Sequence, residues 1–349
     1  KGSEYIDENR VKVENPEFSI NSIFPYFRKY EAYYNDNFSF RSFLISWYNV
    51  LKYNLSGTSP LDSVYIGKEG WLFLAKESGI TLDKYYFSFD LFKSSDMKLW
   101  KERILQRKNW AESLGCTYLL IVIPNKQTIY PKMMPSGMNT ALSKSMMDQL
   151  FEYLHPELDN IVIDLRNKFR KEKEEHRLYQ KTDTHWNQLG AYSAYRSILN
   201  YLSVISGENI EPDDISEFRI ELREKDGGDL ARLLSFHKSK YRDRIITLER
   251  EEDNNIESSE INPDFADSSV LVNKNKNGQF PPLLFIYDSF GEYLNRYLSS
   301  QFIESYLIQN RDLNIYSDLI KKKGIKYIVE EIAERHFLQK PPEALSYGR

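Results

Sequence analysis

The fold of this 349-residue chain is decided by residues 283–291, LLFIYDSFG. An apolar and aromatic run bounded by a polar turn is typical of a fully buried strand. Leu294 and Leu298 follow at helical spacing, so Ser289 is expected where a buried strand passes into an amphipathic helix. Ligands of open α/β sheets bind beyond the carboxyl ends of the strands. Ser289 is therefore a candidate nucleophile, with a simple helix N-cap as the alternative.

The same alternation of helix and buried strand recurs elsewhere in the chain. Apolar residues at mostly helical spacing end at Gly115 and precede the apolar run 116–123. A second helical pattern precedes residues 161–165, and a short helix candidate precedes residues 325–329. Buried strands that alternate with amphipathic helices imply a parallel sheet covered on both faces. We therefore expect a three-layer α/β domain.

Two regions depart from this alternation. Val64–Ile66 and residues 71–74 flank a two-glycine turn and are expected to form a hairpin. Between residues 217 and 281 the pattern is strand-like, and the acidic stretch 251–262 interrupts it. This pattern predicts a β excursion with an exposed loop.

The domain organisation follows from the remaining pattern. Residues 1–60 are polar and aromatic without clear periodicity, so we expect a lead-in segment with a few helical turns packed on the main body. Residues 61–349 are expected to form one domain. No stretch is apolar over the ~18 to 20 residues that a membrane helix needs.

Composition excludes several classes of protein. With 41% hydrophobic and 28% charged residues, the chain can bury a large core and is not a disordered protein. A net charge of -4 gives no reason to expect nucleic-acid binding. The single cysteine, Cys116, excludes an internal disulfide and a thiolate metal cage.

His185 is the most informative of the five histidines. It precedes a segment with apolar residues three to four apart, so it is expected on a loop at a helix N-terminus, with Asn187 as the N-cap. There the helix dipole favours the neutral imidazole, which can accept a proton, and Asp183 can orient the ring. The alternative is a purely structural pair. No metal is expected, because no further cluster of ligands is present in the sequence.

Five short motifs together resemble a known family. They are GKEGWLF at residues 67–73, PNK at 124–126 with IYP at 129–131, TDTHW at 182–186, GDL at 228–230 and DSF at 288–290. In this order they are similar to the SGNH-hydrolase-like O-acetyltransferases of bacterial exopolysaccharide acetylation, the alginate acetylation proteins J and X and their relatives. The likeness covers residues 64 to 337.

The resemblance implies roles for individual residues. In that family the Asp-x-His-Trp element supplies the acid and base, and the later serine supplies the nucleophile, which corresponds to Asp183, His185 and Ser289 here. A flavodoxin-like sheet is also implied, and the position of the serine after the histidine is consistent with a circularly permuted topology. Tyr287 stands where SGNH proteins usually have glycine, and a large side chain there can reshape the oxyanion hole.

Six further residues are candidates for contact with the substrate: Asn125, Lys126, Tyr130, Trp186, Gly228 and Tyr293. Asn125 and Gly228 are candidates for the oxyanion hole, unless they only end a strand and form a turn. Lys126 and Tyr130 can line the cleft, with a solvated loop as the alternative. Trp186 and Tyr293 are the aromatic residues expected nearest to the reacting groups.

The resemblance also implies a function. It predicts an O-acetyltransferase, without a cofactor, that moves an acetyl group through an acetyl-serine to a polysaccharide hydroxyl. A membrane-bound acyltransferase would supply the acetyl group. The expected location is the periplasm or cell surface, with an N-terminal signal or anchor that is missing here, since the chain begins Lys1-Gly2-Ser3.

Three alternatives stay open. The same three residues with water as the acceptor make a carbohydrate acetylesterase. A catalytically lapsed polysaccharide-binding or assembly protein would keep the fold without the chemistry. A metal-dependent hydrolase that uses His185 is disfavoured by the sparse set of ligands.

Overall fold

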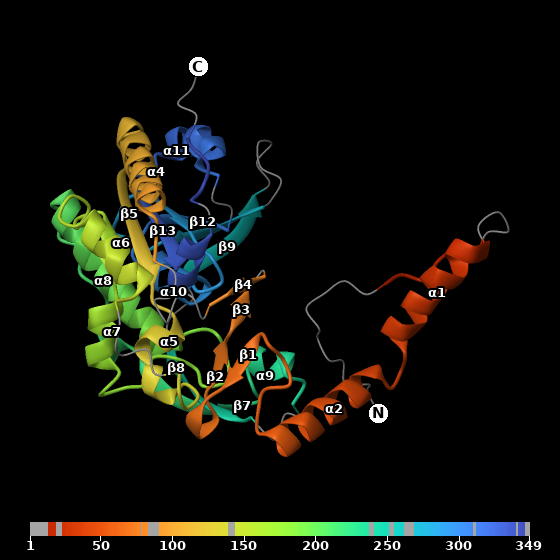
Figure 1. Cartoon of the computed structure of the whole chain (residues 1–349). Helices are drawn as coiled ribbons and strands as arrows, with labels where there is room; N and C mark the ends of the chain where they lie inside the picture. Colours follow the sequence, from red (N-terminus) through yellow and green to blue (C-terminus); the bar gives the residue numbers. More distant parts are fainter. Residues whose placement is uncertain are drawn as a thin grey trace.

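The computed structural model describes residues 13–18, 23–77, 79–82, 91–138, 144–236, 241–250, 255–261, 269–309, 312–339 and 341–345. Within these residues, a seven-stranded sheet forms the centre of the molecule, in the order β6-β5-β13-β11-β12-β10-β9 (Figure 1). The strands are β6 (Val162–Asp164), β5 (Thr117–Ile123), β13 (Tyr327–Ala333), β11 (Leu283–Ile286), β12 (Glu304–Ile308), β10 (Val270–Asn275) and β9 (Ile256–Ile261). The first five are parallel to one another, which confirms the predicted parallel sheet. β10 pairs antiparallel with β12, and β9 pairs antiparallel with β10.

Helices cover both faces of this sheet. On one face lie α7 (Arg166–Glu172), α8 (Gln188–Ser206) and α10 (Glu292–Ser299), and on the other α4 (Ser94–Ser113), α6 (Met146–Leu154) and α11 (Ser317–Lys323). Strand β5 shows why three layers form. Its side chains enter the two cores alternately, with Leu119, Ile121 and Ile123 on the α8 side and Tyr118, Leu120 and Val122 on the α4 side. Because both faces of the strand are buried, its sequence is continuously apolar.

The β excursion has two parts. β7 (Arg219–Lys225) pairs with β8 (Asp243–Glu249) outside the central sheet, and α9 (Asp229–Leu233) lies between them in the chain. β10 and β9 instead extend the central sheet. The predicted loop 251–262 is therefore wrong for Ile256–Ile261, which is the edge strand, whereas residues 251–254 and 262 lie outside the described residues.

The N-terminal segment forms an arm that leads away from the domain (Figure 1). It consists of α1 (Ile23–Asn37) and α2 (Arg41–Ser56). α2 is tied to the domain, because Ser46 Oγ donates to the Ser235 carbonyl at 2.6 Å and Asn49 Nδ2 donates to the Leu234 carbonyl at 2.9 Å. α1 has no buried residue, so of these two helices only α2 packs on the domain as the sequence suggested.

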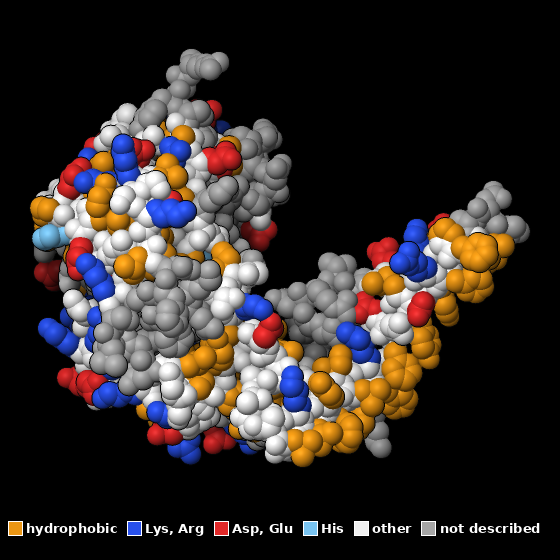
Figure 2. Space-filling model, in the orientation of Figure 1, with side chains coloured by type: hydrophobic (Ala, Val, Ile, Leu, Met, Phe, Trp, Pro, Cys, Tyr) orange, Lys and Arg blue, Asp and Glu red, His pale blue; other side chains and the backbone are white. Residues whose placement is uncertain are grey.

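Apolar side chains line one side of the arm (Figure 2). The large exposed ones include Phe24, Phe27, Tyr30, Tyr34, Phe43, Leu44, Trp47, Tyr48 and Leu55. Beyond the arm, β1 (Val64–Ile66) and β2 (Leu72–Leu74) form the predicted antiparallel hairpin, followed by the short pair β3 (Lys76–Glu77) and β4 (Ile80–Thr81). In the described part of the chain, no helix has both the length and the hydropathy needed to cross a bilayer.

Candidate active site

Ser289 and His185 are 104 residues apart in the sequence and meet at the carboxyl edge of the parallel strands. Ser289 follows β11, and His185 lies three residues before α8. The Oγ atom of Ser289 is 2.9 Å from Nε2 of His185. Ser289 is exposed, so a substrate can reach its hydroxyl from solvent. The structure thus brings together a hydroxyl and an imidazole in the geometry of a nucleophile and its base.

Asp183 completes the arrangement. Its Oδ1 atom is 2.7 Å from His185 Nδ1. Because a carboxylate only accepts hydrogen bonds, Nδ1 must carry a proton, and Nε2 of the neutral ring then accepts from the Ser289 hydroxyl. The backbone N–H groups of His185 and Asp229 donate to the two oxygens of Asp183, each at 3.1 Å. These bonds hold the carboxylate in place.

Electrostatics couples the two side chains. Burial alone would raise the pKa of Asp183, but the hydrogen bond to His185 and the charge of the ring lower this pKa below its ordinary value. Burial would lower the pKa of His185, but the hydrogen bond to Asp183 and its charge outweigh burial and raise the pKa above 6.5. The adjacent carboxylate therefore determines the direction of the net shift, and the expected effect of the helix dipole on the ring does not reverse it.

Local sequence explains how the His185 loop is held. The side chain of Asn187 accepts from the backbone N–H groups of Leu189 and Gly190, at 3.0 and 3.1 Å, so the predicted N-cap of α8 is confirmed. Lys126, in the short helix α5 (Lys126–Ile129), is 2% exposed. It therefore does not lie on a solvated loop, and it does not project into an open cleft.

Lys126 fixes the loop that carries Asp183. Its Nζ atom donates to the carbonyl groups of Gln180, Lys181 and Asp183, at 3.1, 3.2 and 2.6 Å. Burial lowers the pKa of Lys126 to about 7, although nearby carboxylates such as Asp229 act in the opposite direction. The three carbonyl oxygens around Nζ show that the Lys126 side chain is a buried donor to the backbone.

Replacing Lys126 with Met is expected to lower the free energy of unfolding by about 3 kcal/mol, because buried carbonyl groups lose their charged donor. Chemical denaturation with urea measures this change. Lys132→Met is the matched control, since Lys132 is exposed, and it should change the stability by less than about 0.5 kcal/mol. Equal unfolding midpoints for the two variants would contradict this role of Lys126.

The backbone of Gly228 packs directly against the Asp183 side chain. A Cβ atom at Gly228 would lie 2.4 Å from Asp183 Cβ and 2.5 Å from its Oδ2, so only glycine fits here. The backbone N–H of Gly228 donates to Thr182 Oγ1 at 3.0 Å. Because that donor is already used, the structure does not place Gly228 in an oxyanion hole.

Asn125 has the properties that an oxyanion donor requires. It is 3% exposed, and its Nδ2 atom has no hydrogen-bond partner among the described residues. Its backbone N–H donates to Glu334 Oε2 at 2.6 Å, which fixes the residue. Asn125, Thr184 and Arg335 contribute to the lining of a cavity of about 10 Å³, close to the space of one water molecule. A buried, unpaired amide donor next to the His185 loop is available for a developing negative charge.

The three aromatic candidates have different positions. Trp186 is fully buried, and its Nε1 donates to the Phe290 carbonyl at 3.1 Å, so it supports the Ser289 turn and does not line a cleft. Tyr130 is also buried; its hydroxyl accepts from Leu178 N–H at 2.9 Å. Both rings face the core because large aromatic surfaces gain most from burial. Tyr293 is half-buried.

Tyr287, which stands in place of the usual glycine, is accommodated inside the core. Its ring stacks on Phe285 with 5.1 Å between centroids and is 6% exposed. A Cβ atom at Gly291 would lie only 2.3 Å from Tyr287 Cβ, so this glycine makes the room. The aromatic side chain packs against the strand and the start of α10, and the structure gives no sign that it fills the space above Ser289.

Charged residues at the end of β13 hold the Ser289 turn, and the sequence analysis missed them. Glu331 Oε2 accepts from the backbone N–H of Asp288 at 2.9 Å. Asp288 Oδ2 accepts from Ala333 N–H at 2.9 Å and pairs with His336 Nδ1 at the same distance. The available signal was the stretch 330–336, EEIAERH, in which charged residues interrupt the end of an otherwise apolar strand.

Arg335 is a further residue that the sequence analysis missed. It is 5% exposed, and its guanidinium group lies 5.2 Å from the centre of the Phe290 ring. The Phe290 ring in turn lies 4.8 Å from the His185 ring, measured between centroids. Arg335 also pairs with Glu77 at 2.6 Å. A buried positive charge therefore lies close to the reacting groups.

Asp229, from the GDL motif, joins the site on the Nδ1 side of His185. Ligand atoms of Asp183, His185 and Asp229 lie within 4.8 Å of one another. Asp229 Oδ1 accepts from the backbone N–H of Thr184 at 2.7 Å. Burial and the charge of Asp183 raise the pKa of Asp229. A metal ion bound by all three groups would have to displace the proton that Nδ1 donates to Asp183, so the observed hydrogen bonds favour a triad.

Comparison with known proteins identifies the family. A family model described as "SGNH hydrolase-like domain, acetyltransferase AlgX" matches residues 64–277, more than half of the chain. The chain belongs to this family. The segment that matches the AlgX family contains Asp183 and His185 and ends before Ser289, so the serine is located by the fold and not by the match.

One named relative is also similar to this chain in sequence. The probable alginate O-acetylase AlgJ of Pseudomonas aeruginosa is 29% identical over 168 residues, which are 46% of this chain and 38% of AlgJ. The match therefore spans well under half of the length of that relative.

Two solved structures share the fold. Bacillus cereus PatB1 with a sulfonyl adduct has a TM-score of 0.61 at 14% identity, covering 83% of this chain and 100% of PatB1. The O-acetyltransferase domain of Pseudomonas putida AlgJ has a TM-score of 0.51 at 17% identity, covering 80% of this chain and 94% of that domain. The predicted SGNH-hydrolase-like fold is thereby confirmed.

Proposed function

We propose that this protein is an O-acetyltransferase that acetylates hydroxyl groups of an extracellular or cell-surface polysaccharide through an acetyl-serine on Ser289. The observation that carries this proposal is the hydrogen-bonded series from exposed Ser289 through His185 to Asp183. Family membership and the names of the relatives, an alginate O-acetylase and an O-acetyltransferase domain, support acetyl transfer.

The proposed reaction has two balanced halves. Ser289 Oγ attacks the carbonyl carbon of the acetyl donor while its proton passes to His185 Nε2, and the leaving oxygen of the donor then takes that proton. In the second half a sugar hydroxyl gives its proton to Nε2 and attacks the acetyl-serine. The Ser289 oxygen leaves and takes the proton back. Asp183 stabilises the imidazolium that forms in each half.

We further propose that Asn125 Nδ2 donates to the oxyanion of each tetrahedral intermediate. Its burial and its lack of a partner in the described structure support this role. The guanidinium of Arg335, which lines the same small cavity, adds positive charge on that side of the site. Donors that are fixed before the reaction stabilise the transition state most strongly.

The test of this function distinguishes transfer from hydrolysis. The protein is incubated with an activated acetyl ester and candidate oligosaccharides, and mass spectrometry reports whether a sugar gains about 42 Da, the mass of an added acetyl group. A gain supports the transferase, and free acetate alone supports an acetylesterase. No turnover would indicate a catalytically lapsed protein. Loss of activity with a chelator would support a metal-dependent hydrolase instead.

We also propose where the reaction takes place and which protein supplies the acetyl group. Resemblance to the exopolysaccharide acetylation proteins supports a location outside the cytoplasm, next to a membrane-bound acyltransferase that supplies the acetyl group. We also propose that residues 1–60 are a lead-in segment to the domain 61–349. The start of the family match at residue 64 supports this boundary.

Activity should depend on pH through His185. The ring must be neutral at Nε2 to accept the serine proton, and Asp183 raises the pKa of His185 above 6.5. We therefore expect kcat/KM for an activated acetyl ester to be low in acid and to rise with pH, with an apparent pKa above 6.5. A pH–rate profile measures this. A rate that does not change between roughly pH 5 and 8 would contradict the assignment of His185 as the base.

A further inference from the structure

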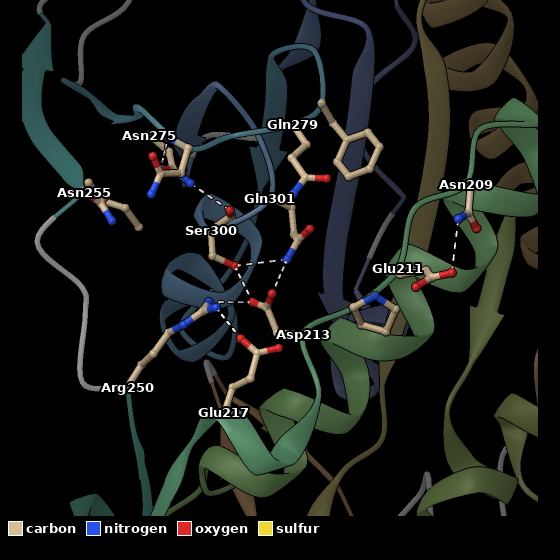
Figure 3. Close-up of a pocket in the computed structure, with 14 residues that line it drawn as sticks. Asn209, Glu211, Asp213, Glu217, Arg250, Asn255, Asn275, Gln279, Ser300 and Gln301 are labelled. Atoms are coloured by element: carbon tan, nitrogen blue, oxygen red, sulfur yellow. Dashed lines mark hydrogen bonds and ion pairs between the residues drawn. The ribbon is translucent and has the colours of Figure 1, made fainter.

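Figure 3 shows a second, polar pocket. The residues that line it place it at the edge of the sheet opposite to Ser289. Phe280, which precedes β11, and Gln301, which follows α10, line it, whereas Ser289 lies between the end of β11 and the start of α10. The pocket has a volume of about 480 Å³, within the usual range of roughly 300 to 1,000 Å³ for ligand sites. It is therefore separate from the reacting groups and large enough for one or two sugar units.

A fixed network of side chains forms one wall of this pocket (Figure 3). Asp213 accepts from Arg250 Nη1 at 2.8 Å, from Ser300 Oγ at 2.9 Å and from Gln301 Nε2 at 2.9 Å. Arg250 also donates to Glu217 at 2.5 Å. Segments far apart in the sequence thus meet in one rigid polar surface, and a ligand that binds there loses little free energy to ordering these side chains.

The chemistry of the lining fits a carbohydrate. Six of the fourteen lining residues are amides: Asn209, Asn255, Asn275, Asn277, Gln279 and Gln301. An amide group can both donate and accept, as a sugar hydroxyl does, so the two pair well. Asn275 and Gln301 already donate their N–H groups within the protein, so the other four amides are the ones that can pair with a sugar. The ring of Phe280, which is half-buried, provides an apolar surface for the C–H face of a sugar ring.

The charges of the lining restrict the kind of carbohydrate. Glu211, Asp213 and Glu217 are acidic, whereas Arg250 is the one basic residue among those that line the pocket. The excess of negative charge repels the carboxylate groups of a uronic-acid polymer. An uncharged glycan meets no such repulsion.

We infer that this pocket binds an uncharged segment of a glycan at a distance from the triad. Such a second contact point would hold a polymer on the protein and raise the local concentration of its hydroxyl groups near the domain. The binding step does not require the proposed acetyl transfer, so the two can be tested apart.

The test is a binding titration of the full chain without an acetyl donor. Isothermal titration calorimetry is used with uncharged hexasaccharides of glucose, mannose and N-acetylglucosamine, and with an oligouronate of the same length. At least one uncharged hexasaccharide should bind about tenfold more tightly than the oligouronate. No binding of any uncharged hexasaccharide, or equal affinity for the oligouronate, would overturn the inference.

Variants locate the binding in this pocket. Asn209 and Gln279 are exposed, so the double variant Asn209→Ala/Gln279→Ala should fold normally and bind at least about fivefold more weakly. Asn160→Ala is the matched control, an exposed amide that is not part of the lining, and should bind like the wild type. Unchanged affinity in the double variant would refute the site. Ser289→Ala should retain binding, so a failure of the acetyl-transfer proposal would leave this result intact.

Discussion

Replacing Ser289 with Ala is expected to lower kcat for an activated acetyl ester by about 10³-fold or more. The substitution removes the only hydroxyl that the structure places within 2.9 Å of His185 Nε2 among the described residues. His185→Ala should have an effect of the same size, because the base and the nucleophile act as a unit. The double variant Ser289→Ala/His185→Ala should therefore have a kcat no lower than that of either single variant.

Matched controls separate chemistry from folding. Ser289 is exposed, so its replacement should change the free energy of unfolding by less than about 0.5 kcal/mol. Ser113→Ala, at the exposed C-terminal end of α4, should leave the rate unchanged. Release of p-nitrophenol from its acetate ester measures the rates. Full activity in the Ser289 variant would remove the proposed mechanism.

Asp183→Asn is expected to have the second large effect, also about 10³-fold on kcat. An amide group can donate toward Nδ1, which would shift the ring proton to Nε2 and prevent it from accepting the Ser289 proton. The variant would also lose the charge that raises the pKa of His185. The activity that remains should therefore be lost in acid at a lower pH than the activity of the wild type.

Asp229→Asn is the informative comparison for Asp183→Asn. Asp229 Oδ2 lies 3.8 Å from His185 Nδ1, compared with 2.7 Å for Asp183 Oδ1. We expect the Asp229 variant to lose about tenfold or less, since it does not accept the hydrogen bond that orients the ring. Equal losses in the two variants would show that the role assigned to Asp183 alone is incorrect.

Within the central sheet, the strands that the sequence predicted most directly are those buried on both faces. Residues 116–123 and 283–287 are almost entirely apolar because each belongs to a strand covered by helices on both sides. Strand β12 was not predicted, because polar Glu304 and Ser305 begin it. The edge strand β9 resembles a loop in its sequence, since its four central residues are exposed and are glutamates and serines.

The candidate site residues were predictable where polar residues lie next to a strand or helix boundary: Ser289 follows β11, and Asp183 and His185 precede α8. Sequence neighbours do not reveal the direction of a side chain. Trp186 follows His185 in the chain but is fully buried, whereas the side chain of His185 is 21% exposed. The burial of Lys126 could not be predicted either, because it depends on carbonyl groups about 55 residues away.

The most direct test of the account is the reaction of Ser289 with a sulfonyl fluoride. A sulfonyl fluoride forms a covalent adduct with a serine hydroxyl that a neighbouring base activates. Peptide mapping by mass spectrometry should find one labelled residue, Ser289, and the labelling rate should fall at least about 100-fold in His185→Ala. Labelling of another residue, or equal labelling of Ser289 in both proteins, would contradict the claim that His185 activates this serine.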